Sequence, residues 1–119
     1  MRTSCLLLPL LVLAACGRQP AEPTGIYRLG TAEKTMVLEV RASGDYVLQI
    51  DGADSMTDEI RGRWDEERSE HADATFHGLA WRGDQPEPAT ALWPVTFGSD
   101  GGICLDGEGL LCFIKDGEA

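Results

Sequence analysis

Residues 36–52 read MVLEVRASGDYVLQIDG and predict a β-hairpin. At the centre stands the three-residue loop Ala42-Ser43-Gly44, whose final glycine is typical of a type I turn followed by a left-handed residue. If Arg41 pairs with Asp45, one side of the pair is apolar and the other is mostly polar, as in a half-buried antiparallel ladder. The apolar residues that then face one another are Val40 and Tyr46, Leu38 and Leu48, and Met36 and Ile50.

Two later stretches contain the same kind of loop, GSDGG at residues 98–102 and DGEGL at residues 106–110. Their registers again keep apolar residues on one face, with Phe97 opposite Ile103, Val95 opposite Leu105, Leu105 opposite Leu111, and Ile103 opposite Phe113. Because a slip of one residue would move every side chain to the other face, three loops independently favour one buried face.

The region after Thr24 reads as a series of short strands, because its apolar residues alternate rather than recur every three and four positions. Eight runs bounded by turn residues lie near 25–29, 34–41, 45–51, 60–66, 74–81, 90–97, 102–106 and 110–115. This pattern predicts an all-β fold, a small antiparallel up-and-down barrel or a curled meander of about eight strands. A two-sheet β-sandwich is the alternative.

Two features indicate where such a sheet bends and ends. A longer loop at residues 67–73 would set Trp64 opposite Phe76 and Gly62 near Gly78, which predicts either a bend or an aromatic ring lying over bare backbone. Pro94 has no N–H to donate to a ladder, so we expect it at a sheet edge and expect imperfect closure near LWPVTF, residues 92–97.

The third loop also places Cys104 directly across from Cys112, on the face away from the apolar residues. Facing residues in antiparallel strands lie close enough for a disulfide, and an exported chain would be oxidised. We therefore predict a structural disulfide worth roughly 2.5 kcal/mol from the entropy of the closed loop. A redox-active pair is the alternative, but the spacing is unlike Cys-x-x-Cys.

The amino terminus has the pattern of an export signal. Met1-Arg2 is followed by the apolar run CLLLPLLVLAA at residues 5–15, which is too short to span a bilayer as a helix. The junction Leu13-Ala14-Ala15-Cys16 resembles the lipobox of bacterial lipoproteins. An ordinary cleaved signal with an incidental cysteine is the alternative.

The lipobox resemblance implies that Cys16 carries a diacylglyceryl group, palmitate among its acyl chains, and becomes the first residue after cleavage. Two or three acyl chains make a stable membrane anchor where one chain does not. The chain would then divide into a signal peptide (1–15), a lipidated cysteine and flexible tether (16–24), and one β-domain (25–119). Gly17 follows the cysteine where Asp would favour inner-membrane retention, so the resemblance implies an outer-membrane location facing the periplasm.

The domain resembles small lipocalin-like barrel lipoproteins of bacterial envelopes through TGIYRL at 24–29, the hairpin at 36–52 and RGRW at 61–64. Copper-associated members of that group carry a Cys-x-x-Cys near the first strand, which is absent here, so no metal or stress-sensing role is carried over. Lipoprotein inhibitors of lysozyme are similar in size, architecture and disulfide use, but their Trp-x-Lys-Gly element is missing from this chain.

The charge balance limits the classes of partner. The chain has 10 Lys and Arg residues against 20 Asp and Glu, a formal net charge of −10. Loss of Arg2 with the signal would make the charge about −11, which gives no electrostatic basis for binding nucleic acid. An acidic surface could attract a basic protein, although solubility alone also explains it. Cys16 would then be the chain's hold on a membrane.

No pattern of catalytic residues emerges, and we expect neither an enzyme nor a bound cofactor or metal. The two histidines, His71 and His77, do not converge with enough ligands for zinc, and the acidic stretch at 51–59 lacks the calcium-loop spacing. The serines stand outside any nucleophile motif. The tryptophans at 64, 81 and 93 fit a core as well as the mouth of a site for a small apolar ligand.

These observations predict a lipid-anchored envelope lipoprotein with a non-catalytic binding or structural β-domain. The alternative is an inhibitor of a basic enzyme such as lysozyme.

Overall fold

The computed structural model describes residues 22–52, 57–66, 68, 70, 72–98, 100–105 and 109–117. Within these ranges the chain forms β-strands and no helix. The strands are β1 (Gly25–Gly30), β2 (Lys34–Val40), β3 (Asp45–Gly52), β4 (Thr57–Asp65), β5 (Ala74–Arg82), β6 (Gln85–Val95), β7 (Ile103–Cys104) and β8 (Cys112–Gly117). They form one antiparallel sheet in the order β6-β5-β4-β3-β2-β1-β8-β7.

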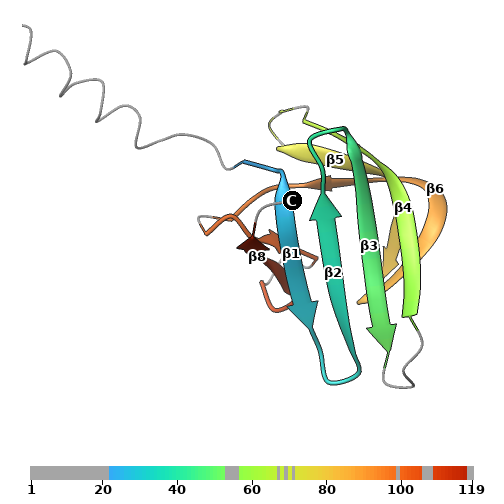
Figure 1. Cartoon of the computed structure of the whole chain (residues 1–119). Helices are drawn as coiled ribbons and strands as arrows, with labels where there is room; N and C mark the ends of the chain where they lie inside the picture. The colour runs from blue at the N-terminus through green and yellow to red at the C-terminus, as the bar shows by residue number, and fades with distance from the viewer. Residues whose placement is uncertain are drawn as a thin grey trace, which may run out of the picture.

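The sheet curls around a single interior (Figure 1), so the architecture is the predicted curled meander rather than a two-sheet sandwich. The β2–β3 hairpin has the predicted register, with Val40 opposite Tyr46 and Leu48 opposite Leu38. The loop is closed by hydrogen bonds between Arg41 and Asp45 and from Gly44 N–H to the Arg41 carbonyl, both 3.0 Å long. Gly44 has φ of 96°, the left-handed conformation that the sequence predicts.

The interior is packed with the inward-facing residues of every long strand. The fully buried side chains include Tyr27, Met36, Leu38, Val40, Tyr46, Leu48, Phe76, Leu79, Ile103 and Phe113. The three tryptophans lie against this core and are partly buried. Hydrophobic burial on one face of one sheet therefore holds the fold together.

Tyr46 and Gly62 pack closely together where β3, β4 and β5 lie side by side. Gly62 pairs with Tyr46 across β3 and β4, and the Tyr46 ring covers the bare backbone of Gly62. The Tyr46 hydroxyl reaches past it and donates a 2.7 Å hydrogen bond to the His77 carbonyl on β5. Of the two predicted explanations for this glycine, an aromatic ring over bare backbone is confirmed. Gly78 has φ of 90° and lies in a bulge between β5 and β6.

β6 is an edge strand, as expected for a segment with Pro94, and the barrel closes only weakly beyond it. A single isolated bridge joins Phe97 to Ile103, in the predicted register. The predicted continuation to Val95 and Leu105 does not form: β7 ends at Cys104, and Leu105 lies outside any strand. On its other side, Leu105 donates its N–H to the Leu111 carbonyl at 2.7 Å, in agreement with the predicted pairing of these two residues. The neighbouring proline removes one of the donors that a continued ladder would need.

Several strand bounds differ from the prediction. β6 begins at Gln85 rather than near residue 90, because Gly83 and Asp84 form a two-residue hairpin loop that the strand pattern did not predict. Although proline is disfavoured within strands, Pro86 and Pro88 pair with β5 here. β4 begins at Thr57, β7 is limited to two residues, and β8 extends to Gly117, where it still pairs with Ile26 of β1.

A disulfide joins Cys104 of β7 to Cys112 of β8, and these two residues face one another as predicted. The Cα atoms are 3.9 Å apart. Adjacent Ile103 and Phe113 are buried, so the bridge lies on the opposite face from the core. The disulfide fastens the short strand at the end of the sheet.

The far end of the barrel, away from the chain's entry into β1, is crossed by an ion pair. Lys34 begins β2 and its Nζ lies 3.1 Å from the carboxylate of Asp84 in the β5–β6 loop, although two strands separate β2 from β5 in the sheet. The Lys34 side chain is only 7% exposed. A buried cation needs such a partner, so the ion pair holds the β5–β6 hairpin across this end.

Residues 1–21 lie outside the described part of the chain, so the signal peptide, Cys16 and Gly17 stay predictions. His71 and the loop residues 53–56 and 106–108 also lie outside the described ranges. Among the described residues, no helix is long and apolar enough to cross a bilayer.

Candidate functional site

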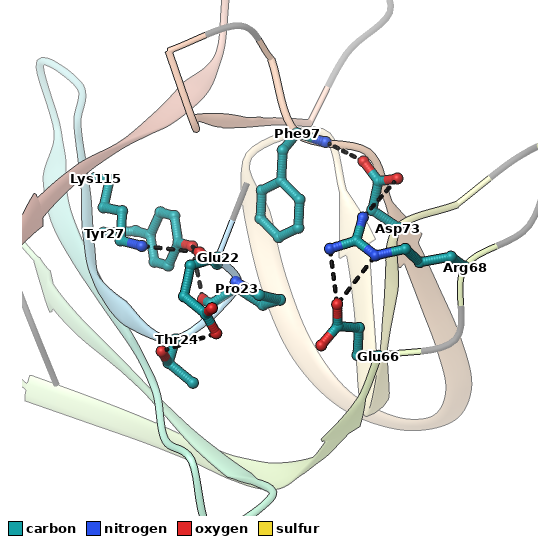
Figure 2. Close-up of polar contacts among 9 residues, drawn as sticks. All are labelled: Glu22, Pro23, Thr24, Tyr27, Glu66, Arg68, Asp73, Phe97 and Lys115. Atoms are coloured by element: carbon teal, nitrogen blue, oxygen red, sulfur yellow. Dashed lines mark hydrogen bonds and ion pairs between the residues drawn. The ribbon is translucent and has the colours of Figure 1, made fainter. Parts of the chain in front are cut away.

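The described segment nearest to Cys16, residues 22–24, is bound to the end of the barrel. We call residues 22–24 the strap (Figure 2). Pro23 is fully buried, and its carbonyl accepts a 2.6 Å hydrogen bond from the Tyr27 hydroxyl. The Glu22 carbonyl accepts a 2.8 Å hydrogen bond from Lys115 Nζ on β8. The strap is therefore fixed to two strands, β1 and β8.

Tyr27 is the centre of this site. Its ring is fully buried, stacks on Phe97 with centroids 6.5 Å apart, and has Lys115 Nζ 5.8 Å from its centroid. Burial raises the pKa of Tyr27 to about 12, and the nearby Glu22 carboxylate acts in the same direction. The hydroxyl therefore stays protonated and continues to donate to the strap well into the alkaline range.

Asp73 makes the main polar contacts at the same barrel end, on the side opposite the strap (Figure 2). Its carboxylate accepts a 2.9 Å hydrogen bond from the Phe97 N–H and lies 3.2 Å from Arg68, which also pairs with Glu66 at 2.7 Å. The Asp73 N–H donates to the Val95 carbonyl at 2.7 Å. Because the Phe97 ring packs on Tyr27, these contacts connect the β4–β5 loop to the tyrosine that binds the strap.

The strap changes the predicted length of the tether. The sequence predicts a flexible tether over residues 16–24, yet residues 22–24 are bound to the barrel. The part left between Cys16 and the first fixed residue is residues 17–21. No turn motif predicts this docking, and part of it depends on Lys115, far away in the sequence.

A second feature surrounds His77 on the outer face of β5. His77 Nε2 lies 2.7 Å from the Asp65 carboxylate, and both side chains are about half exposed. Beside it is an open, mostly apolar hollow of about 330 Å³, lined by His77, Gly78, Ala89, Thr90, Ala91 and Leu92. A histidine–carboxylate pair can move a proton, but among the described lining residues no hydrogen bond joins His77 to a hydroxyl or thiol nucleophile.

The tryptophans act as packing residues in this structure. Trp81 contacts Trp93 and Phe113 with ring centroids 5.2 and 6.0 Å apart. Trp64 donates its indole N–H to the Arg41 carbonyl at 2.7 Å and so connects β4 to the β2–β3 loop. Within the described ranges, no three His, Cys, Asp or Glu side chains converge as metal ligands.

Comparison with known protein families, with curated proteins and with solved structures finds no match to this chain. Its function is therefore inferred from the chain's own residues and geometry.

Proposed function

We propose that this chain is a lipid-anchored lipoprotein of the bacterial cell envelope, whose β-domain binds or supports other molecules without catalysis. Cys16 carries the anchor, residues 1–15 are removed, and Gly17 favours the outer membrane with the domain facing the periplasm. The observation that carries the proposal is the sequence Leu13-Ala14-Ala15-Cys16 after a short apolar run.

The strap supports this proposal because it fixes the chain to the packed barrel a short distance after Cys16. Cys16 stands six positions before Glu22, whose carbonyl is bound to Lys115. Each buried CH₂ of an acyl chain contributes about 0.8 kcal/mol to membrane binding, so two or three chains would hold the domain stably. The disulfide and the packed interior fit a rigid scaffold in an oxidising compartment.

The test is fractionation of a bacterium that expresses the full chain. Wild-type protein is expected in the membrane fraction, and in the outer membrane after gradient separation. Cys16→Ser is expected to leave the membrane or to accumulate uncleaved. Cys5→Ser is the matched control, because it removes a cysteine from the apolar run and should leave anchoring unchanged. Equal release of both variants, or membrane retention of cleaved Cys16→Ser, would refute the proposal.

A second candidate, inhibition of a basic enzyme such as lysozyme, is favoured by the acidity of the far barrel end. A polar hollow of about 320 Å³ lies there, lined by residues 31–35, Asp51 and Gly52. Glu33 and Asp51 are exposed at its rim, whereas the Lys34 charge is paired with Asp84. Mature protein in nonionic detergent would be titrated against lysozyme. Unchanged lysozyme activity at a micromolar excess of protein rejects this candidate.

A further inference from the structure

We infer that the strap orients the barrel on the membrane, so that the strap end lies against the lipid headgroups and the opposite end points away. This inference rests on the proposed lipidation of Cys16 and goes beyond it, since an anchored domain could equally rotate freely on its tether.

The reach of the chain limits how far the barrel can lie from its anchor. An extended chain spans at most about 3.3–3.6 Å per residue, so Glu22 can lie no more than roughly 21 Å from Cys16. Without docking, the free segment would extend to β1 at Gly25 and would reach roughly 30 Å. Docking shortens the tether by about a third.

The chain also approaches the barrel from one end only. Pro23 is fully buried and the strap is bound to both Tyr27 and Lys115, so the first fixed residue, Glu22, lies at one end of the barrel. Figure 1 shows the chain entering there, at the upper end of β1, with the turn between β1 and β2 at the opposite end. The proposed lipid anchor is therefore attached at one end of the barrel.

The height of the barrel separates its two ends. β3 has eight residues, and a strand rises about 3.3 Å per residue, so the two ends are roughly 25 Å apart. The segment at 96–98 and the β4–β5 loop lie at the strap end, and the turns at 31–33 and 83–84 lie at the other. The strap end is thus shielded by the bilayer, and the acidic far end is free for a soluble partner.

Energy transfer from dyes at the two ends to acceptor-labelled headgroups tests this orientation. Ala32→Cys and Thr96→Cys each place a label at an exposed residue, one at the far end and one at the strap end. The lipidated protein would be inserted into vesicles of phosphatidylethanolamine and phosphatidylglycerol. We expect several-fold more efficient transfer from position 96 than from position 32.

The double variant Tyr27→Phe with Lys115→Met removes the hydrogen bonds from β1 and β8 to the strap with little change in volume. We expect it to reduce the difference between the two dye positions. Tyr46→Phe is the matched control, because it removes another hydroxyl bound to a backbone carbonyl without touching the strap, and it should keep the difference. Circular dichroism checks that each variant is folded.

Two failures can be told apart. Vesicle flotation and the mass of the intact protein are measured first, and a protein without acyl chains that does not float overturns both the anchor and the orientation. A lipidated, floating protein with equal transfer from both positions, or more from position 32, overturns the orientation alone. An undiminished difference in the folded double variant overturns the role of the strap.

Discussion

Replacing Gly62 with alanine tests how closely the Tyr46 ring packs over the backbone of Gly62. A Cβ at this position would lie 2.5 Å from the His77 carbonyl oxygen and 2.6 Å from the Tyr46 hydroxyl. Neither atom can move freely, because one is backbone and the other belongs to a fully buried ring packed edge-on against Phe76 at 5.3 Å. We expect the Tyr46 ring to be displaced and its hydrogen bond to His77 to be lost.

The magnitude follows from these two losses. Overpacking a tight site costs about 1–3 kcal/mol, and losing the part-buried hydrogen bond costs about 1 kcal/mol. Gly62→Ala should therefore destabilise the protein by about 3 kcal/mol, which lowers Tm by roughly 12–24 °C for a domain of this size. Urea unfolding followed by tryptophan fluorescence, and thermal unfolding by circular dichroism, measure both quantities.

Gly30→Ala is the matched control. Gly30 also lies in a strand, a Cβ added to it would meet no atom within 4 Å, and its φ is not in the left-handed region. Its substitution should change stability by about 0.5 kcal/mol or less, as is usual for an unconstrained surface site. If Gly62→Ala is as stable as Gly30→Ala, the Tyr46 ring does not pack tightly over Gly62 and our account of this contact is incorrect.

Three further predictions concern ionisation and cross-links. Burial raises the pKa of both tyrosines of this chain to about 12, so the folded state keeps protons that the unfolded state loses near pH 10. The free energy of unfolding should therefore fall between about pH 10 and pH 12. Tyrosinate absorbance in the folded protein near pH 10 would contradict this prediction. Replacing Cys104 and Cys112 together with serine should cost roughly 2.5 kcal/mol in urea unfolding, and an unchanged midpoint would show that the bridge is dispensable. Asp84→Asn leaves the buried Lys34 unpaired and should lower the free energy of unfolding by about 2 kcal/mol or more. Lys34→Met removes the charge itself and should leave stability nearly unchanged. The reverse order of stabilities would contradict a buried Lys34–Asp84 ion pair.

The parts of the fold that could be predicted from sequence are those determined by local loops. Ala42-Ser43-Gly44 fixes the register of β2 and β3 because its glycine must be left-handed, and the side-chain alternation on both strands agrees with it. The pairing of Cys104 with Cys112 followed from the same logic, with Gly109 at φ of 76° in the intervening loop. Each inference used residues fewer than twenty positions apart.

The misses have two causes. The early start of β6 had a local signal, the Gly83-Asp84 loop, which the strand pattern alone did not use. The contact of the strap with Lys115 and the Lys34–Asp84 ion pair had no local signal. They depend on contacts between β1 and β8 and between β2 and the β5–β6 loop, which exist only once the sheet has curled.

The central claim is that Cys16 is an acylated amino terminus, and mass spectrometry of the protein isolated from bacterial membranes tests it most directly. Trypsin cleaves after Arg18, so the terminal peptide would be Cys16-Gly17-Arg18. We predict this peptide with a diacylglyceryl thioether on the sulfur, with no trace of residues 1–15. A terminal peptide that begins elsewhere, or that carries a free Cys16 thiol, would contradict the account.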